Sequence, residues 1–374
     1  MKIREILISL VLISCLPGLN QLFAAEIIGE ITYLDDEIEI TRNSVALDYV
    51  DIGTAIENFY LLTTGEYGLA EIALSTEGSP DTTIKVSPNT AFYFELDQLK
   101  QGNKTTLGMI SGSVSMKVRK MSRSQAFEIR TESATMGVRG TSFTVTTTVT
   151  GDLLITCDEG RVSCRDEEDS ELFAVPGKAV EKRSGEIFRA IPVAVSDLRT
   201  FQNNWYAERL SVFKSNALKV LRGYAVRYLT LVENFNQAYN RLYRNKEIIS
   251  KWFRQESSGT MGSTMENMRE KKKLIGDLLR LRRVLFIFER VYFRLQELKS
   301  YYDQGYGRGT IKAGLTADAF FRRFERDKDE LSRKMARIRY ITKLYSIRNN
   351  GSFPTDAFST DESGDSFLNS DFSF

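Results

Sequence analysis

Hydrophobic and polar residues alternate with a period of two over roughly the first half of the chain. In 112–120 (GSVSMKVRK), Val114, Met116 and Val118 fall on one face. Turn-forming Gly, Asn, Asp and Pro interrupt such runs at intervals of about 8–12 residues, which is typical of short strands in a β-domain. The pattern over 26–194 therefore predicts an all-β domain, built as a sandwich, a barrel or a roll.

The clearest strand pair in this pattern lies at 152–166 (DLLITCDEGRVSCRD). Two apolar runs flank the turn residues 158–160, and Gly160 can adopt the positive φ that a tight turn needs, so we expect a β-hairpin. Cys157 and Cys164 lie on its two arms. The two possible registers place these residues on opposite faces or diagonally at about 7–8 Å. Two packed free thiols are therefore favoured over a disulfide, although export would permit one.

Beyond residue 195 the apolar positions recur every three or four residues, which predicts helices. We expect three long helices, over 196–254, 265–302 and 316–348, the last with Thr316 as its N-cap. Long helices with short connections suggest an antiparallel bundle or a coiled coil. The fold class is thus mixed, with two separate domains: the all-β domain and then a helical domain over 195–348.

One stretch of the β-region does not fit a plain strand, namely 136–145 (MGVRGTSFTV). Val138 and Phe143 differ in parity, so both can face a core only if the chain is redirected between them. Gly140 lies where that kink or bulge must occur. Arg139 beside it has two open interpretations: an ion pair within an acidic domain, which is favoured, or contact with an anionic ligand.

Three quoted segments together, FEIRTESATMGVRGTSFTV, GDLLITCDEGRVSC and VPGKAV, resemble the FecR domain family, over roughly residues 26–190. The resemblance implies an extracytoplasmic β-roll or a solenoid-like stack of short strands. It also implies a partner-binding or sensing role for the motif residues, which are Val138, Arg139, Gly140, Thr141, Phe143 and Gly160.

Family members that regulate iron uptake carry a cytoplasmic anti-sigma segment, a membrane span and then this domain, which senses an outer-membrane transporter. This sequence has only a five-residue charged cap before its apolar leader, and its second half is helical. We therefore expect neither transmembrane sigma signalling nor siderophore sensing.

Residues 1–25 have the layout of a secretory signal peptide. Lys2 and Arg4 precede an apolar run over 6–16, which is too short to span a bilayer. The stretch LISC also resembles a lipobox, so Cys15 is a candidate lipidation site, and an uncleaved anchor is a third interpretation. All three predict a bacterial protein exported to the periplasm or the outer envelope.

The composition excludes much catalytic chemistry. There is no His and there are only three Cys, so His-based catalysis, Ser-His-Asp triads and thiolate zinc sites are excluded. We predict no cofactor and no metal. A cell-wall hydrolase would need a carboxylate pair, for which Glu128 with Glu132, or Asp158 with Glu159, are nominal candidates. None lies in a recognisable signature, so we do not expect an enzyme.

Charge divides the chain sharply. Residues 26–194 carry 16 basic and 27 acidic residues, a net charge of −11, whereas 195–348 carry 33 and 16, a net charge of +17. So large a charge predicts an anionic partner: the acidic domain itself, anionic lipid or cell-surface polymer at the membrane periphery, or an acidic protein. The candidate contacts are Lys271, Lys272, Lys273, Arg280, Arg282 and Arg283. The export signal argues against nucleic acid.

The last segment, 349–374, has five acidic residues, no basic residue and many Ser and Gly, which predicts a disordered tail. The sequence as a whole predicts a non-enzymatic envelope protein whose β-domain binds or senses a partner. Its helices would extend it, form an oligomer or hold an anionic surface.

Overall fold

The computed structural model describes residues 27–42, 45–74, 82–97, 104–119, 126–166, 170–350 and 353. The signal peptide predicted at 1–25, with its lipobox, lies outside these residues. So does nearly all of the tail predicted at 349–374.

Within the described ranges, seventeen strands make up the first half of the chain. They are β1 (Ile27–Asp35), β2 (Ile38–Arg42), β3 (Val45–Ala46), β4 (Ala55–Glu57), β5 (Leu61–Thr64), β6 (Leu69–Leu74), β7 (Thr82–Val86), β8 (Ala91–Asp97), β9 (Lys104–Val118), β10 (Ala126–Arg130), β11 (Ala134–Val138), β12 (Ser142–Thr147), β13 (Leu153–Glu159), β14 (Val162–Asp166), β15 (Glu171–Ala174), β16 (Lys178–Lys182) and β17 (Arg189–Pro192).

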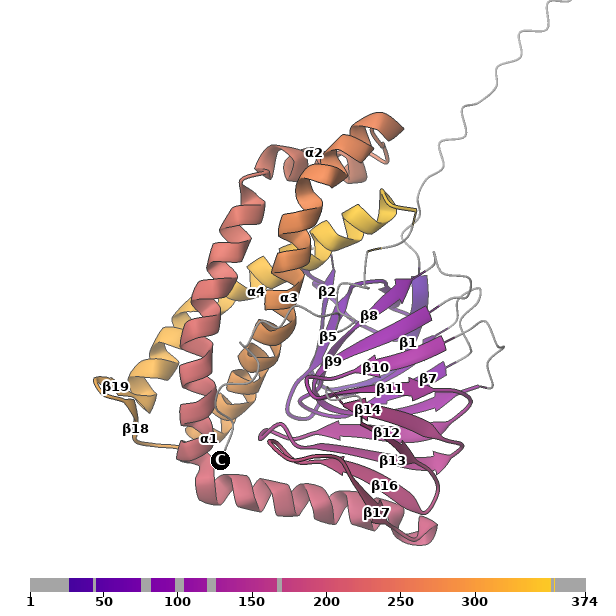
Figure 1. Ribbon diagram of the computed structural model, residues 1–374, viewed down its shortest axis with the longest axis vertical. Helices are drawn as coiled ribbons and strands as arrows, with labels where there is room; N and C mark the ends of the chain where they lie inside the picture. The colour runs from indigo at the N-terminus through magenta and orange to yellow at the C-terminus, as the bar shows by residue number, and fades with distance from the viewer. Residues whose placement is uncertain are drawn as a thin grey trace, which may run out of the picture.

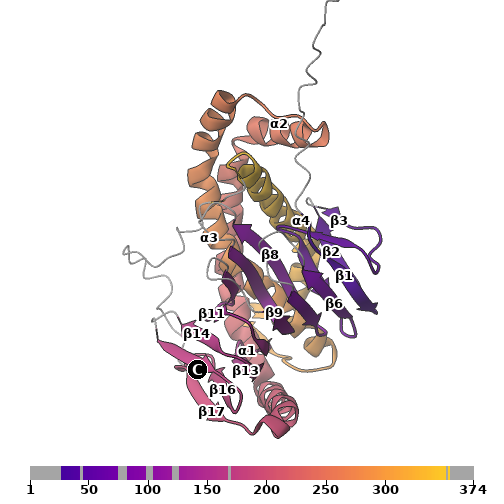
Figure 2. The same cartoon turned by 90° about the vertical axis from the view of Figure 1, so that its right-hand side faces the viewer.

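The strands form two layers that face each other (Figure 1; Figure 2). Layer A runs β4-β1-β6-β7-β9-β12-β13-β16-β17, and layer B runs β3-β2-β5-β8-β9-β10-β11-β14-β15. The first half of β9 belongs to layer B and its second half to layer A. Apolar side chains from both layers fill the space between them, among them Ile72, Phe92 and Phe127. The period-two pattern follows from this arrangement, because each strand turns one face to the core.

The chain repeatedly crosses from one layer to the other, and several of these crossings, among them the five given below, use a residue with positive φ. A sharp change of direction favours that conformation, which Gly adopts without the steric cost of a Cβ. The crossing residues and their φ values are Asn89 (53°), Gly112 (91°), Gly140 (66°), Gly160 (86°) and Gly177 (88°).

The hairpin predicted at 152–166 is therefore wrong. β13 pairs with β12 and β16 in layer A, whereas β14 pairs with β11 and β15 in layer B. Gly160 redirects the chain between layers instead of closing a hairpin, and its positive φ fits either role. Cys157 and Cys164 consequently enter the core from facing layers, where both are buried as free thiols.

Four helices follow the strands: α1 (Leu198–Tyr243), α2 (Lys246–Ser257), α3 (Thr264–Asp303) and α4 (Ala317–Ile347). A short 3-10 turn, Val195–Asp197, precedes α1, and a two-stranded hairpin of β18 (Thr310–Lys312) and β19 (Leu315–Thr316) joins α3 to α4. The N-cap prediction is confirmed, because the Thr316 hydroxyl accepts a hydrogen bond from the backbone N–H of Ala319 at 3.2 Å.

The first predicted helix, 196–254, is two helices. The helical backbone stops at Arg244 and Asn245, and the turn there allows Ile249 and Trp252 of α2 to be buried in the helical core. A single straight helix could not bring these side chains back onto the bundle. Within the described residues, none of the helices combines the length and the apolar run needed to span a bilayer.

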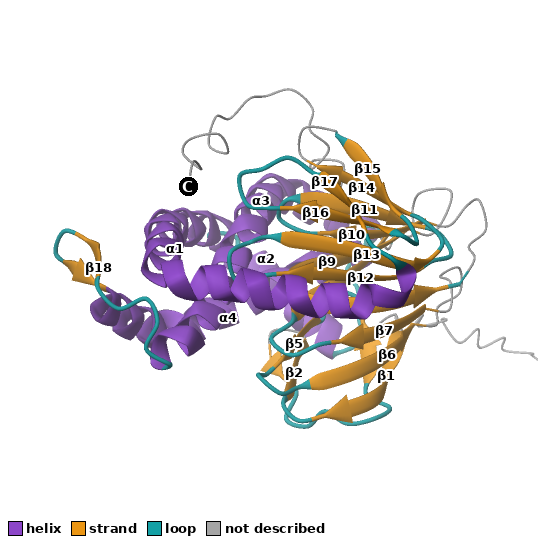
Figure 3. Cartoon of the chain, turned by 90° about the horizontal axis from the view of Figure 1, so that it is seen from below, coloured by secondary structure: helices purple, strands orange, loops and turns teal. Residues whose placement is uncertain are grey.

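α1 itself bends at Asn216, whose φ of −122° is not helical. Before the bend, α1 crosses the outer face of layer A, where Leu198 and Trp205 pack against Leu154 and Ala179 (Figure 3). After the bend, α1 turns along α3 and enters the bundle (Figure 1). One helix therefore covers part of the β-domain and also builds the helical core.

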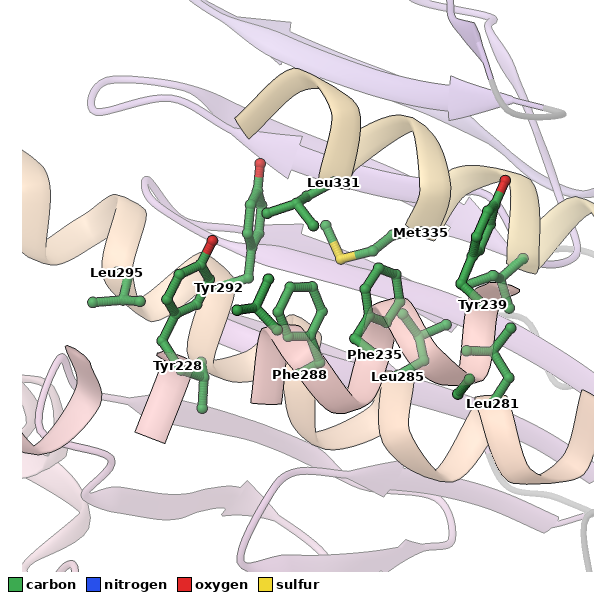
Figure 4. Packing of buried hydrophobic residues seen from close by; sticks show 14 of the residues in the cluster. Tyr228, Phe235, Tyr239, Leu281, Leu285, Phe288, Tyr292, Leu295, Leu331 and Met335 are labelled. Carbon is green, nitrogen blue, oxygen red and sulfur yellow. The ribbon is translucent and has the colours of Figure 1, made fainter. Parts of the chain in front are cut away.

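The core of the helical region is rich in aromatic side chains (Figure 4). Phe235 of α1 stacks on Phe288 of α3, with ring centroids 4.4 Å apart, and Tyr228 meets Phe324 of α4 edge to face at 5.4 Å. Such pairs stabilise a core beyond the area they bury. These aromatic residues serve in packing and are not exposed for stacking on a ligand.

α3 and α4 cover the outer face of layer B at its N-terminal half. Phe293 of α3 packs on a small apolar patch formed by Leu61, Ala91 and Ile110. Two ion pairs join the basic helices to the acidic β-domain: Lys343 with Glu57 at 2.6 Å, and Arg227 with Glu132 at 2.8 Å. Part of the charge asymmetry in the sequence is thus neutralised within the chain.

Candidate functional site

The redirected stretch at Gly140 lies at an edge of the β-domain where two neighbouring crossings meet. β11 in layer B ends at Val138, and β12 in layer A begins at Ser142. Val138 and Phe143 are both buried in the core, so the predicted change of direction at Gly140 is confirmed. The sequence predicted a kink within one strand; the structure shows a passage from one layer to the other.

The two crossings fit tightly against each other. A Cβ added to Gly160 would lie 2.8 Å from the carbonyl oxygen of Gly140 and 2.8 Å from Cγ2 of Thr141. Thr141 is buried, and its own carbonyl accepts a hydrogen bond from the Val118 N–H at 2.8 Å. Four motif residues, Gly140, Thr141, Phe143 and Gly160, therefore shape the backbone and the core. They are not available to a ligand as side chains.

Next to this edge, the outer face of layer B is hollowed. The groove has a volume of about 480 Å³ and is lined by Phe127, Glu128, Gly137, Val138, Arg139, Arg161 and Ser163. We call it the layer-B groove. It lies on the part of layer B formed by β10, β11 and β14.

The groove follows from one row of residues across the strands. Glu128 pairs with Gly137, Gly137 with Ser163, and Ser163 with Phe173. Gly137 leaves the middle of the row empty, since a Cβ there would meet only the Ser163 Cβ, at 3.9 Å. The small residues Gly137 and Ser163 thus lie between the larger Glu128 and Phe173, and the row forms a trough across the sheet.

Two arginines stand at the open end of this trough. Val138 pairs with Val162, so Arg139 and Arg161 are the next residues outward at the same edge, and both are exposed. The Arg161 guanidinium stacks on Phe173, with its carbon 3.4 Å from the ring centroid. A stacked guanidinium still presents its N–H edge to a ligand.

Arg139 makes no hydrogen bond or ion pair with any part of the chain that the structure describes, so the ion pair favoured from the sequence is not found there. Glu128, the acidic residue of the groove, contacts Arg130 at 3.3 Å. The groove therefore combines two accessible cations with an acid that is already engaged. This arrangement suits a carboxylate or another anionic group, because guanidinium groups bind carboxylates with two parallel hydrogen bonds.

Neither nominal pair of catalytic acids is a buried carboxylate pair, and Glu128 is engaged by Arg130. Glu132 lies in the turn after β10 and pairs with Arg227, while Asp158 and Glu159 are exposed at the end of β13 in the other layer. Burial raises the pKa of Cys157 to about 11, and a thiol held protonated is a poor nucleophile. Among the described residues, no cluster of three or more acidic or Cys side chains could hold a metal ion.

The six basic residues singled out in the sequence lie on α3 and divide into two groups. Lys271 donates a hydrogen bond to Asn349 at 2.8 Å, and Arg282 covers the ring of Phe353 at 4.3 Å, so both serve the chain's own C-terminal part. The other four side chains are exposed: Lys272, Lys273, Arg280 and Arg283.

Comparison with known families decides what the crossing motif belongs to. The family model described as FecR protein matches residues 60–163, which span β5 to β14 and include the groove. Residues 60–163 are therefore similar to a FecR domain. The match is narrower than the 26–190 over which the sequence resemblance extends, and it ends before β15 and the helices.

Solved structures add little beyond the FecR domain. Two crystal structures of a candidate anti-sigma factor from Parabacteroides distasonis ATCC 8503 are similar at 14% sequence identity and a TM-score of 0.31. The similarity covers 38% of this chain and 64% or 63% of that protein, less than two thirds of its length. Similarity at this level says nothing about function. A search of curated proteins finds no match.

Proposed function

We propose that this protein is a non-enzymatic partner-binding or sensing module of the bacterial cell envelope. In this proposal the FecR domain recognises an acidic segment of a partner protein in the layer-B groove. Envelope placement is supported by the family, whose members are envelope-associated, and by the leader-like sequence at 1–25.

The observation that carries the proposal is the pair of exposed arginines at the groove. Arg139 has no partner among the described residues, and Arg161 is held by Phe173 with its polar edge outward. The remaining motif residues maintain the crossing backbone beneath them. The site in this proposal therefore has two parts: a rigid crossing that sets its position, and two cations, Arg139 of the motif and Arg161 beside it, that contact the partner.

The test is cross-linking of the full chain in its native host, followed by purification and mass spectrometry. The variant is Arg139→Ala with Arg161→Ala. We expect it to lose at least one specific cross-linked protein while its free energy of unfolding changes by less than about 0.5 kcal/mol, as for exposed substitutions elsewhere.

A matched control removes two exposed cations elsewhere on the β-domain, with Lys85→Ala and Arg165→Ala. Lys85 lies on layer A, and Arg165 lies on β14, four residues after Arg161. The control should keep every cross-link. If both variants lose the same proteins, or neither loses any, the groove is not the binding site.

The hydrolase alternative finds no support, since Glu128 and Glu132 are paired with arginines and Asp158 and Glu159 are exposed. Binding of an anionic surface by the helices would use a different part of the molecule.

A further inference from the structure

The N-terminal half of α3 presents an unusual solvent face. Its exposed side chains include two methionines, Met265 and Met268, each 64% exposed. The others on this face are five cations and a glycine: Arg269, Lys272, Lys273, Gly276, Arg280 and Arg283. At 3.6 residues per turn, these eight positions fall within an arc of about 140° and extend for about 27 Å along the helix. We call this surface the α3 cationic face.

The acidic residues of this half of α3 are turned away from the face or already engaged. Lys251 of α2 makes ion pairs with both Glu266 and Glu270, and its Nζ lies 2.8 Å from Oε1 of Glu270. Asp277 is half-buried at the flank. Leu274, Leu278 and Leu281 lie on the opposite side of the helix and are buried in the core.

The cations of this face differ from those of α4. On α4, three exposed arginines each have an acidic partner: Arg322 with Asp318, and Arg323 and Arg326 with Asp327. On the α3 cationic face, within the described part of the chain, none of the five cations makes an ion pair. Charge left unneutralised in a row on one helix suits an extended anionic surface better than a single small ion.

The position of the face also leaves it accessible. The corner between α2 and α3 projects beyond the strands at the top of Figure 1, and the β-domain packs further along α3, at Arg290 and Phe293. Apolar side chains beside a row of cations are the signature of a helix that lies in the headgroup region of a membrane.

We propose that the α3 cationic face binds the surface of an anionic phospholipid bilayer, with Met265 and Met268 entering the headgroup region. This surface is separate from the layer-B groove, and either can exist without the other. An acidic protein and the chain's own acidic C-terminal end are the competing occupants.

The test is sedimentation of residues 26–374 with lipid vesicles. One set of vesicles is pure phosphatidylcholine, and the other is phosphatidylcholine that contains phosphatidylglycerol. Binding should require the anionic lipid and should weaken with salt. The variant Lys272→Ala, Lys273→Ala, Arg280→Ala should lower the partition coefficient on the order of 100-fold, because each basic residue near such a surface contributes a factor of several.

The matched control, Arg322→Ala, Arg323→Ala, Arg326→Ala, removes the same charge from α4 and should bind almost as the unchanged chain does. Ala is favourable in helices, so both variants should fold. Met265→Gln with Met268→Gln should weaken binding without changing its salt dependence. Equal loss in the α3 and α4 variants, which would mean non-specific attraction, overturns the proposal.

Two further results would also overturn it. One is binding to soluble polyglutamate but not to vesicles, which would assign the face to an acidic protein. The other is vesicle binding only by a chain shortened after Phe353, which would assign the face to the chain's own acidic end.

Discussion

Lys343 of α4 donates a hydrogen bond to Glu57 of β4, with Nζ and Oε2 2.6 Å apart, and so joins residues 286 positions apart in the sequence. The side chains are only 7% and 12% exposed. Breaking a buried ion pair by removing one partner typically costs about 3–5 kcal/mol, because the other charge stays buried and unpaired. We expect Lys343→Met to lower the free energy of unfolding by that amount in urea titrations.

The double variant Lys343→Met, Glu57→Gln should recover much of this loss, since no unpaired charge remains. Arg322→Met, at an exposed pair on α4, should change stability by less than about 1 kcal/mol. If Lys343→Met were as mild as Arg322→Met, the helices would not be fixed on the β-domain through this contact.

Two glycines should respond to alanine in opposite directions. Gly160 has a φ of 86°, and a Cβ there would press on the Gly140 carbonyl, so Gly160→Ala should destabilise the protein by about 1–3 kcal/mol. Gly276 is a helical residue of α3 with open space around it, so Gly276→Ala should stabilise by about 1 kcal/mol. Thermal unfolding of both variants tests the crossing geometry, which a neutral Gly160→Ala would contradict.

Glu181 of β16 should make stability depend on acid pH. It is buried and accepts hydrogen bonds from Trp205 of α1 at 2.7 Å and from Arg189 at 2.9 Å. Burial alone would raise its pKa, but the hydrogen bonds from Trp205 and Arg183 and the charges of the two arginines outweigh burial, so the pKa lies below its ordinary 4.5.

A carboxyl group whose pKa is lowered by folding stabilises the protein above its unfolded-state pKa. That contribution is lost as the pH falls through the folded-state pKa. Glu181→Gln should therefore be less stable than the unchanged protein near about pH 7, and the difference should shrink toward about pH 3. Urea titrations at several pH values measure this, and a constant difference would refute it.

The two buried cysteines should be unreactive in the folded protein. Burial raises the pKa of Cys157 to about 11 and that of Cys164 to about 12, so few thiolates are available near neutral pH. We expect an aromatic disulfide reagent to label them only after unfolding in urea. If the intact mass were lower than that of the reduced protein by two hydrogen atoms, the two cysteines would instead form a disulfide between the layers.

The sequence predicted the β-rich half, the helical half and the change of direction at Gly140, because each follows from local periodicity or from one glycine. It did not distinguish a hairpin from a crossing at Gly160. A hairpin and a crossing both place apolar runs on either side of a residue with positive φ. They differ only in strand pairing: in a hairpin β13 would pair with β14, whereas here β13 pairs with β12 and β14 with β11. The break at Asn245 was missed because the apolar period continues across it.

The groove could not be predicted for a different reason. Its trough joins Glu128, Gly137, Ser163 and Phe173, which come from four strands and become neighbours only through the register of layer B. The one available signal was Gly137, a glycine at an outward position of a strand, which leaves space where a side chain would stand. The exposure of Arg139 likewise depends on which acids lie near it in space.

The most direct test of the central claim is site-specific photo-cross-linking in the native host, with the photoreactive residue at Ser163 in the groove or at Thr144 on the outer face of layer A. We predict a discrete protein adduct from position 163 that disappears when Arg139→Ala and Arg161→Ala are added, and no such adduct from position 144. Equal adducts from both positions, or an adduct from 163 that persists without the two arginines, would contradict binding in the layer-B groove.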